Sequence, residues 1–168
     1  MEIIKADISH AQDLGYVHAK SWRAAYRGIA ADDVVDAFTP QKRAEAFEKA
    51  IPANPDEQEY YLFKVDGRPA GMALLCKKRD EADGEIYAIY FHPDFWGSDA
   101  THQAFAFCVR RLKEQGCGRI FIWVLEKNER ARRFYEKYGF TLDDTPDDGT
   151  QQVDFGVPLT GVRYVKKL

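Results

Sequence analysis

A run of six apolar residues at 120–125, Ile-Phe-Ile-Trp-Val-Leu, restricts the fold more than any other feature of this sequence. A strand with apolar residues on both faces is buried on both faces, as in the interior of a sheet that helices cover. Segments with the spacing of an amphipathic helix lie on either side of the run, at 102–115 and 128–138. The run therefore predicts an α/β fold in which this strand lies inside a sheet flanked by helices.

Further patterns place other strands and helices around that central strand. Asp66-Gly67 predicts a hairpin turn between two strands, and helical spacing predicts an early helix that Ser9 caps and a second helical zone interrupted near Pro40. The expected strands are at 2–7, 60–65, 69–78, 85–91 and 161–165, and the expected early helices at about 9–26 and 32–50. This order predicts one domain over residues 1–168, a layered α/β (α+β) fold with a mixed, mostly antiparallel central sheet between helices.

Charge and cysteine usage limit the class of protein. The 168 residues carry 24 Lys and Arg against 27 Asp and Glu, a net charge of −3 that gives no support to a nucleic-acid partner. No stretch approaches the roughly 18 uncharged apolar residues of a membrane span, and the charged N-terminus is unlike a signal peptide. We therefore expect no membrane partner and a cytoplasmic location with reduced cysteines. The histidines lack metal-ligand spacing, so no metal is expected.

Specific motifs appear between residues 85 and 140. The strand EIYAIYF at 85–91 leads into HPDFWG at 92–97, and NERARRFYEKYGF occupies 128–140. The last stretch is similar to the N-x-x-A-x-x-F-Y-x-x-x-G-F helix of the GNAT acetyltransferase superfamily, which the chain resembles in element order over nearly its whole length. Ser21–Ile29 also resembles an early helix of some small-amine and uncharacterised members. The resemblance implies an N-acetyltransferase that moves acetyl from acetyl-CoA to a primary amine of a small molecule or peptide.

The resemblance also implies where acetyl-CoA binds. Backbone N–H groups at a helix N-terminus form an anion site, and the loop before the 102–115 helix would offer them to the pyrophosphate. In the family a splayed strand pair, here 85–91 and 120–125, leaves backbone groups free for the pantetheine amides. Asn128 would contact the pantetheine arm, although it could equally be a plain helix cap. The implied cofactor-binding residues are Tyr90, Phe91, His92, Trp96, Gly97, Ser98, Asp99, Ala100, Thr101, Asn128 and Arg132.

The phosphate loop departs from the family pattern Q/R-x-x-G-x-G/A. Asp99 and Thr101 stand where small glycines normally allow a phosphate to approach the backbone. The Asp99 carboxylate could itself cap the helix amides and so compete with an anionic ligand, and the alternative to a working CoA site is a helix simply capped by Ser98 or Asp99. This departure motivates an alternative function, a GNAT-like domain that has lost acetyl transfer and acts as a CoA-binding or regulatory module. A third interpretation keeps catalysis with a different acyl-CoA.

Two residues are candidates for acid–base chemistry. Tyr135 matches the family tyrosine that protonates the departing CoA thiolate, although it also belongs to the apolar stripe of its helix. Some members carry a glutamate base at the strand position of Glu85, and alternation would place Glu85 on the same face as Phe91. Glu85 could instead be a solvated residue, with His92 or an ordered water accepting the proton of the amine.

The acceptor site and the charge pattern complete the sequence-based expectations. In this family the early helical region often forms the wall of the acceptor pocket, here Trp22, Tyr26 and Asp32. Acidic residues at 32–36 would suit a cationic amine, although a run of charges is usually a solvated face. The basic stretch at 110–137 would attract the CoA phosphates. An exposed last strand could pair across a homodimer.

Overall fold

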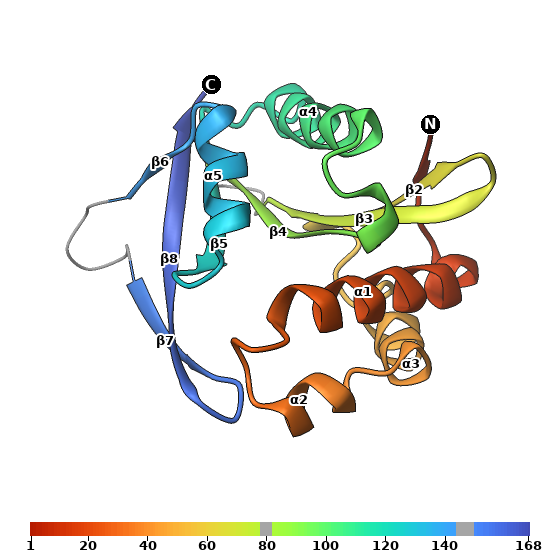
Figure 1. Cartoon of the computed structure of the whole chain (residues 1–168). Helices are drawn as coiled ribbons and strands as arrows, with labels where there is room; N and C mark the ends of the chain where they lie inside the picture. The colour runs from red at the N-terminus through yellow and green to blue at the C-terminus, as the bar shows by residue number, and fades with distance from the viewer. Residues whose placement is uncertain (78–81, 144–149) are drawn as a thin grey trace.

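The computed structural model describes residues 1–77, 82–143 and 150–168, and it shows a sheet with helices on both faces (Figure 1). The strands are β1 (Glu2–Lys5), β2 (Gln58–Val65), β3 (Arg68–Cys76), β4 (Asp83–Phe91), β5 (Arg119–Leu125), β6 (Thr141–Leu142), β7 (Thr150–Asp154) and β8 (Pro158–Lys167). The helices are α1 (Ala11–Tyr26), α2 (Asp32–Ala37), α3 (Pro40–Ala50), α4 (Asp99–Glu114) and α5 (Glu129–Lys137), with short 3₁₀ turns at Ile8–His10 and Pro93–Phe95.

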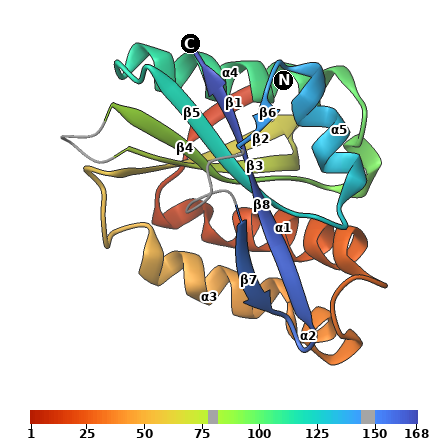
Figure 2. The same ribbon diagram turned by 90° about the vertical axis from the view of Figure 1, so that its left-hand side faces the viewer.

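The strands form one mixed sheet in the order β1-β2-β3-β4-β5-β8-β6, with β7 also paired to β8. Among the described pairings, β4 with β5 is parallel and the others are antiparallel. Helices α4 and α5 cover one face of the sheet, and α1 and α3 cover the other (Figures 1 and 2). The predicted mixed, mostly antiparallel sheet between helices is confirmed, and the apolar run at 120–125 lies inside it as β5.

Strands β4 and β5 pair at one end only. Their parallel register runs from Asp83 opposite Arg119 to Glu85 opposite Phe121 and then stops. Both strands continue beyond this point and diverge, which leaves their facing edges without a strand partner in the described chain (Figure 1). The splayed pair that the resemblance implied is therefore present.

A β-bulge at Tyr87 reverses the side-chain alternation of β4. Ile86 and Ala88 pair with successive residues of β3, so Tyr87 has no residue opposite it. In a regular strand Ile86 and Phe91, five positions apart, would point to opposite faces of the sheet. Because of the bulge, both side chains pack in the same core cluster beneath α4. Glu85, the neighbour of Ile86, therefore lies on the opposite face from Phe91. The prediction that Glu85 and Phe91 share a face is wrong because one inserted residue shifts the period-two pattern.

The ends of several elements differ from those expected. Asp7, not Ser9, caps the first helical turn, because the Asp7 carboxylate accepts from the Ser9 N–H at 2.9 Å and the α-helix itself begins at Ala11. The interruption near Pro40 is confirmed, since α2 ends before it and the Thr39 hydroxyl caps α3.

The last strand is not an exposed edge. β8 pairs with β5 along one side, and on its other side it pairs with β7 and then with the two-residue β6. The sequence patterns predicted two strands after the last helix, with a range for 161–165 alone, whereas the described chain has β6, β7 and β8 there. The structural premise for pairing across a homodimer is therefore wrong.

Gly15 allows α1 and α3 to approach closely. A Cβ atom at this position would lie 2.5 Å from the Ala44 nitrogen and 2.7 Å from the Pro40 carbonyl oxygen, both backbone atoms that cannot rotate away. We expect Gly15→Ala to lower the free energy of unfolding by about 1–3 kcal/mol, although Ala is the better helix former by about 1 kcal/mol. Chemical denaturation measures this, with Gly118→Ala as control because no atom lies within 4 Å of that Cβ. Equal stability of the two variants would contradict the close approach.

Candidate active site

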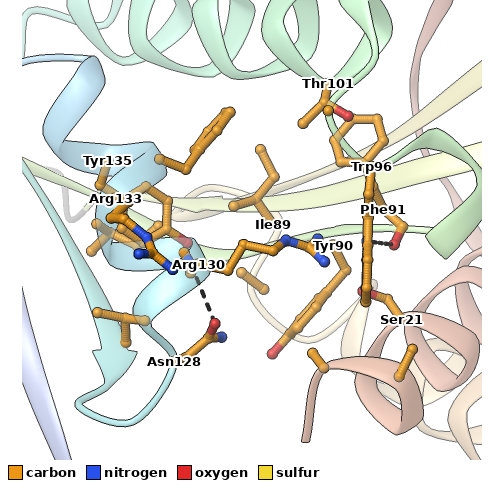
Figure 3. A pocket seen from close by; sticks show the side chains of 18 of the residues that line it. Ser21, Ile89, Tyr90, Phe91, Trp96, Thr101, Asn128, Arg130, Arg133 and Tyr135 are labelled. Carbon is orange, nitrogen blue, oxygen red and sulfur yellow. Dashed lines mark hydrogen bonds between the residues drawn. The ribbon is translucent and has the colours of Figure 1, made fainter.

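A cavity of about 750 Å³ opens where β4 and β5 diverge. Its walls come from the C-terminal half of α1, the ends of β4 and β5, the first turns of α5 and the loop before α4 (Figure 3). Of the residues singled out in the sequence, those that line the cavity are Tyr26, Tyr90, Phe91, Trp96, Gly97, Thr101, Asn128 and Tyr135. Segments far apart in the chain therefore meet at one site.

The backbone of Phe91 faces the side from which β5 has diverged. In an antiparallel ladder, alternate residues bond to the same neighbouring strand, and the His92 N–H donates to the Ala70 carbonyl of β3 at 2.8 Å. Phe91 therefore presents its N–H and C=O to the opposite edge. Its carbonyl accepts a 2.7 Å hydrogen bond from Trp96 Nε1. The N–H of Phe91 is placed to polarise a carbonyl group held in the cavity.

The first turn of α4 borders the cavity through Thr101 and His102. Ser98 is the N-cap residue, but its hydroxyl donates to the Phe95 carbonyl at 2.7 Å, as the Thr101 hydroxyl does at 2.8 Å. Asp99 is exposed, and within the described chain no hydrogen bond joins its carboxylate to the amides of this turn. The predicted self-capping by Asp99 is wrong because Asp99 is the first helical residue rather than the cap. Gly97, with φ of 74°, makes the left-handed turn that leads into the helix.

Tyr135 lies on α5 with its ring in the core and the cavity beside it. The Phe105 ring stacks 5.7 Å away, and the Phe140 and Tyr164 rings lie 6.4 and 6.3 Å away. Burial raises the pKa of Tyr135 above its ordinary value, and the nearby Tyr26 raises it further. The phenol therefore keeps its proton at neutral pH, as a proton donor must. Tyr135 belongs both to the apolar stripe of α5 and to the lining of the cavity.

Two further phenols, Tyr26 of α1 and Tyr90 of β4, line the cavity. Burial raises the pKa of both phenols, and each phenol also affects the pKa of the other. Asn128 caps α5 because its side-chain oxygen accepts a 3.2 Å hydrogen bond from the Ala131 N–H, and Asn128 also lines the cavity. The plain-cap interpretation of Asn128 therefore holds beside its place in the cavity. His18 stacks on Tyr90 at 4.5 Å, and burial lowers the pKa of His18 to about 3. The imidazole of His18 is therefore neutral at pH 7, and it packs against the Tyr90 ring.

Basic side chains of α5 reach the cavity, but not the one chosen from the sequence. Arg130, Arg133 and Lys137 line it at helical spacing. Arg132 faces away, where its guanidinium donates to the Tyr164 hydroxyl at 3.1 Å and to a backbone carbonyl. Arg130 and Arg133 are each next to a residue of the apolar stripe of α5 that lines the cavity, Ala131 and Phe134. That position in the sequence is the signal that could have identified both arginines as cavity residues.

Comparison with protein families now identifies the chain. The model of the acetyltransferase (GNAT) family matches residues 19–140. The chain belongs to the GNAT family. Similar relatives are an uncharacterised N-acetyltransferase of Mycobacterium tuberculosis, 26% identical over 138 residues that cover 82% of this chain and 87% of the relative, and one of Bacillus subtilis, 24% identical over 139 residues that cover 80% and 76%. As a GNAT acetyltransferase, the protein is an acyltransferase enzyme.

Solved GNAT structures share the fold. The PaiA N-acetyltransferase of Thermoplasma acidophilum, solved in complex with coenzyme A, superposes with a TM-score of 0.78 at 19% identity, over 99% of this chain and 98% of that one. YncA of Salmonella typhimurium, described as a putative acetyltransferase with its cofactor acetyl-CoA, has a TM-score of 0.70 at 16% identity, over 100% and 94%. At such identities the similarity establishes the architecture.

Several residues expected in the site of this GNAT acetyltransferase do not line the cavity. They are Trp22, Asp32, Glu85, His92, Ser98, Asp99, Ala100 and Arg132. Trp22 is buried and stacks on Phe38 with ring centres 3.9 Å apart. Asp32 lies at the start of α2 and forms a 3.0 Å ion pair with Arg27 on the surface. Of the predicted acceptor wall, Tyr26 alone lines the cavity.

The two side chains considered as a base lie elsewhere. Glu85 is at the paired end of β4, opposite Cys76 of β3. His92 stacks on Tyr16 with ring centres 5.6 Å apart, and its Nδ1 accepts from the Asp94 N–H. Neither position borders the cavity that holds Tyr135.

The described part of the GNAT chain contains neither a cluster of metal ligands nor an activated thiol. Across residues 1–77, 82–143 and 150–168, no group of three His, Cys, Asp or Glu is placed to hold a metal ion. The same residues include no helix that is long and apolar enough to cross a membrane. The three cysteines are free, and burial raises the pKa of the Cys76 thiol to about 12, the opposite of what an activated nucleophile needs.

Proposed function

We propose that this enzyme transfers an acetyl group from acetyl-CoA to a primary amine of a small molecule or peptide. The observation that carries the proposal is the cavity at the divergence of β4 and β5. It brings together the free edge of β4, the first turn of α4 and the Tyr135 side chain. These are an edge for an extended chain, a site for phosphate and a proton donor.

The residues around the cavity fit acetyl-CoA. Phosphate groups bind where backbone N–H groups gather at a helix N-terminus, and the Ser98 side chain does not cap this one. The Ser98 and Thr101 N–H groups donate to the Phe95 and Ser98 carbonyls, so we expect the amides of 97, 99 and 100 to serve a phosphate. Arg133 and Lys137 add positive charge on the α5 wall. The amides of a pantetheine arm suit an unpaired strand edge, which β4 presents up to Phe91. Acetyl-CoA would supply the activated acetyl group, and these residues would bind and orient it.

In the proposed reaction the amine nitrogen attacks the thioester carbonyl carbon, so that a C–N bond forms and the C–S bond breaks. The Phe91 N–H donates to the carbonyl oxygen as charge develops on it. The electron pair of the broken bond stays on sulfur, which takes the phenolic proton of Tyr135, and Tyr135 regains a proton from solvent. The proton lost by nitrogen passes to water, because Glu85 lies at the far end of β4. The products are an amide and the free thiol of CoA.

The phosphate loop favours a second candidate, a domain that binds CoA or regulates without transferring acetyl. Asp99 adds a negative charge beside the proposed phosphate site, and Thr101 adds a branched side chain. We place this candidate second because the Thr101 hydroxyl is engaged with Phe95 and Asp99 does not cap the helix. We also infer that residues 1–168 act as one domain, and the cytoplasm remains our expectation from the sequence.

Thermal unfolding with added CoA and acetyl-CoA tests the proposal. At a hundredfold excess over Kd, binding to the native state contributes about 2.7 kcal/mol, which raises the Tm of a chain this size by about 5–10 °C. Adenosine at equal concentration is the control, because it lacks the phosphates and the arm. Release of free thiol with a panel of amines then separates the enzyme from the binding module. Absence of a shift with any CoA thioester would exclude the enzyme and the CoA-binding module, and a shift without thiol release would favour the CoA-binding module.

A further inference from the structure

Arg130 and Trp96 meet across the cavity although they are far apart in the sequence. The guanidinium carbon of Arg130 lies 3.3 Å from the centre of the Trp96 ring. Arg130 belongs to the first turn of α5 and Trp96 to the loop before α4, and both line the cavity. Figure 3 shows Arg130 extending from α5 toward Trp96, in front of Ile89 and Tyr90 of β4. The stacked pair therefore joins one wall of the cavity to the other.

One member of the pair is fixed and the other can move. Trp96 is held by the 2.7 Å hydrogen bond from its Nε1 to the Phe91 carbonyl, at the end of the free strand edge. Arg130 is exposed and forms no ion pair with a described residue, whereas Arg133 pairs with Glu129 at 3.5 Å. A cation in the first turn of a helix lies at the positive end of the helix dipole, so Arg130 does not stabilise α5 there. Stacking on Trp96 is the interaction that accounts for its position.

The stacked pair lines the same cavity as Ile89, Tyr90 and Phe91, and in Figure 3 Arg130 lies in front of this part of β4. We infer that Arg130 and Trp96 form a clasp that closes over the thioester arm of the acyl donor, with Arg130 as a positioning residue. This inference rests on the proposed function, because it takes the arm to lie along the free edge of β4. A planar guanidinium on a flexible stem can leave the ring and return to it by side-chain rotation alone. The clasp recognises the uncharged pantetheine thioester rather than the phosphates.

The experiment compares two ligands, CoA and S-acetylpantetheine, which has the arm without the nucleotide and its phosphates. Arg130→Met removes the planar cation and keeps a long, unbranched side chain. We expect this variant to lower the affinity for both ligands by about tenfold. Arg133→Met is the matched control, because it removes one positive charge from the same wall without touching Trp96. We expect Arg133→Met to weaken CoA only. Titrations follow the intrinsic tryptophan fluorescence, and circular dichroism checks that each variant is folded.

Variants of Trp96 test whether the two residues act as a pair. Trp96→Leu should lower the affinity for S-acetylpantetheine as much as Arg130→Met does. The double variant should lose no more affinity than either single variant. Trp96→Phe keeps an aromatic face and should retain most of the affinity. Thermal shift serves as the readout for these variants, because they lose the Trp96 fluorescence.

Each other outcome overturns the inference. If Arg130→Met weakens CoA but not S-acetylpantetheine, Arg130 binds phosphate and there is no clasp. Additive losses in the double variant, or equal effects of Arg130→Met and Arg133→Met on both ligands, would contradict it as well. A wild-type protein that binds CoA but not millimolar S-acetylpantetheine removes the clasp and leaves the proposed function standing. If the wild-type protein binds neither ligand, both the clasp and the proposed function are wrong.

Discussion

Tyr135→Phe is expected to lower kcat by about a hundredfold and to leave the affinity for CoA within about twofold of the wild type. The substitution removes the phenolic proton that the departing sulfur would take, and it keeps the ring that packs against Phe105 and Phe140. The measurement is the rate of thiol release at saturating acetyl-CoA with an amine that the wild-type enzyme accepts. A CoA titration on the same preparation shows whether binding is retained.

Tyr138→Phe is the matched control for this prediction. Tyr138 is the C-cap residue of the same helix, its hydroxyl hydrogen-bonds to His102 Nδ1 at 2.7 Å, and it does not line the cavity. We expect its kcat to stay close to that of the wild type. Equal rates for the two variants would remove Tyr135 from its proposed role. Because burial raises the pKa of Tyr135, loss of its proton should not lower kcat until the pH exceeds the ordinary tyrosine value of about 10.

Glu59→Gln is expected to lower the free energy of unfolding by about 3 kcal/mol at pH 7. Glu59 is a buried carboxylate of β2 that accepts two hydrogen bonds from Arg111 of α4, at 2.7 and 2.8 Å, and others from Lys5 and Tyr61. It therefore ties α4, whose first turn borders the site, to the sheet. The Arg111 hydrogen bonds are the main cause that lowers the pKa of Glu59 from its usual 4.5 to about 2.

The pH dependence gives this prediction its sign. A carboxylate with a lowered pKa in the folded state stabilises the protein above the unfolded pKa, and this contribution disappears as the pH falls from 4.5 to about 2. The difference between wild type and Glu59→Gln should therefore shrink over that range in denaturant titrations. Glu114→Gln is the control, because its ion pair with Arg110 is exposed and worth about 0.5 kcal/mol or less. A constant difference down to pH 2 would contradict the account.

The fold was largely readable from the sequence because hydrophobic periodicity depends on which face of an element is buried. The six apolar residues of β5 and the stripes of α4 and α5 follow the layers of the sheet directly. The faces of β4 were not readable in the same way. The bulge at Tyr87 arises from the register between β3 and β4, and neither strand's own sequence contains that register. Glu85 was therefore placed on the wrong face.

The site shows the same division between local and long-range information. Tyr135 and Phe91 were found because a local motif carries them. Arg132 was chosen although Arg130 reaches the cavity, because the rotation of α5 against the sheet is set by packing with α4 and β8. Capping by Asp99 is wrong by one position, because α4 begins at Asp99 and Ser98 is its N-cap residue. The stack of Arg130 on Trp96 joins the first turn of α5 to the loop before α4, and only the folded chain brings these two segments together.

A crystal structure of the protein with bound CoA would show whether the cavity between β4 and β5 holds the acyl donor. We expect the pyrophosphate to contact the backbone at 97–101 and the arm to hydrogen-bond to the edge of β4 between Ile86 and Phe91. We expect the sulfur to lie within hydrogen-bond reach of the Tyr135 hydroxyl. A pyrophosphate away from the first turn of α4, or a sulfur placed on any element other than the ends of β4 and α5, would contradict this mode of binding.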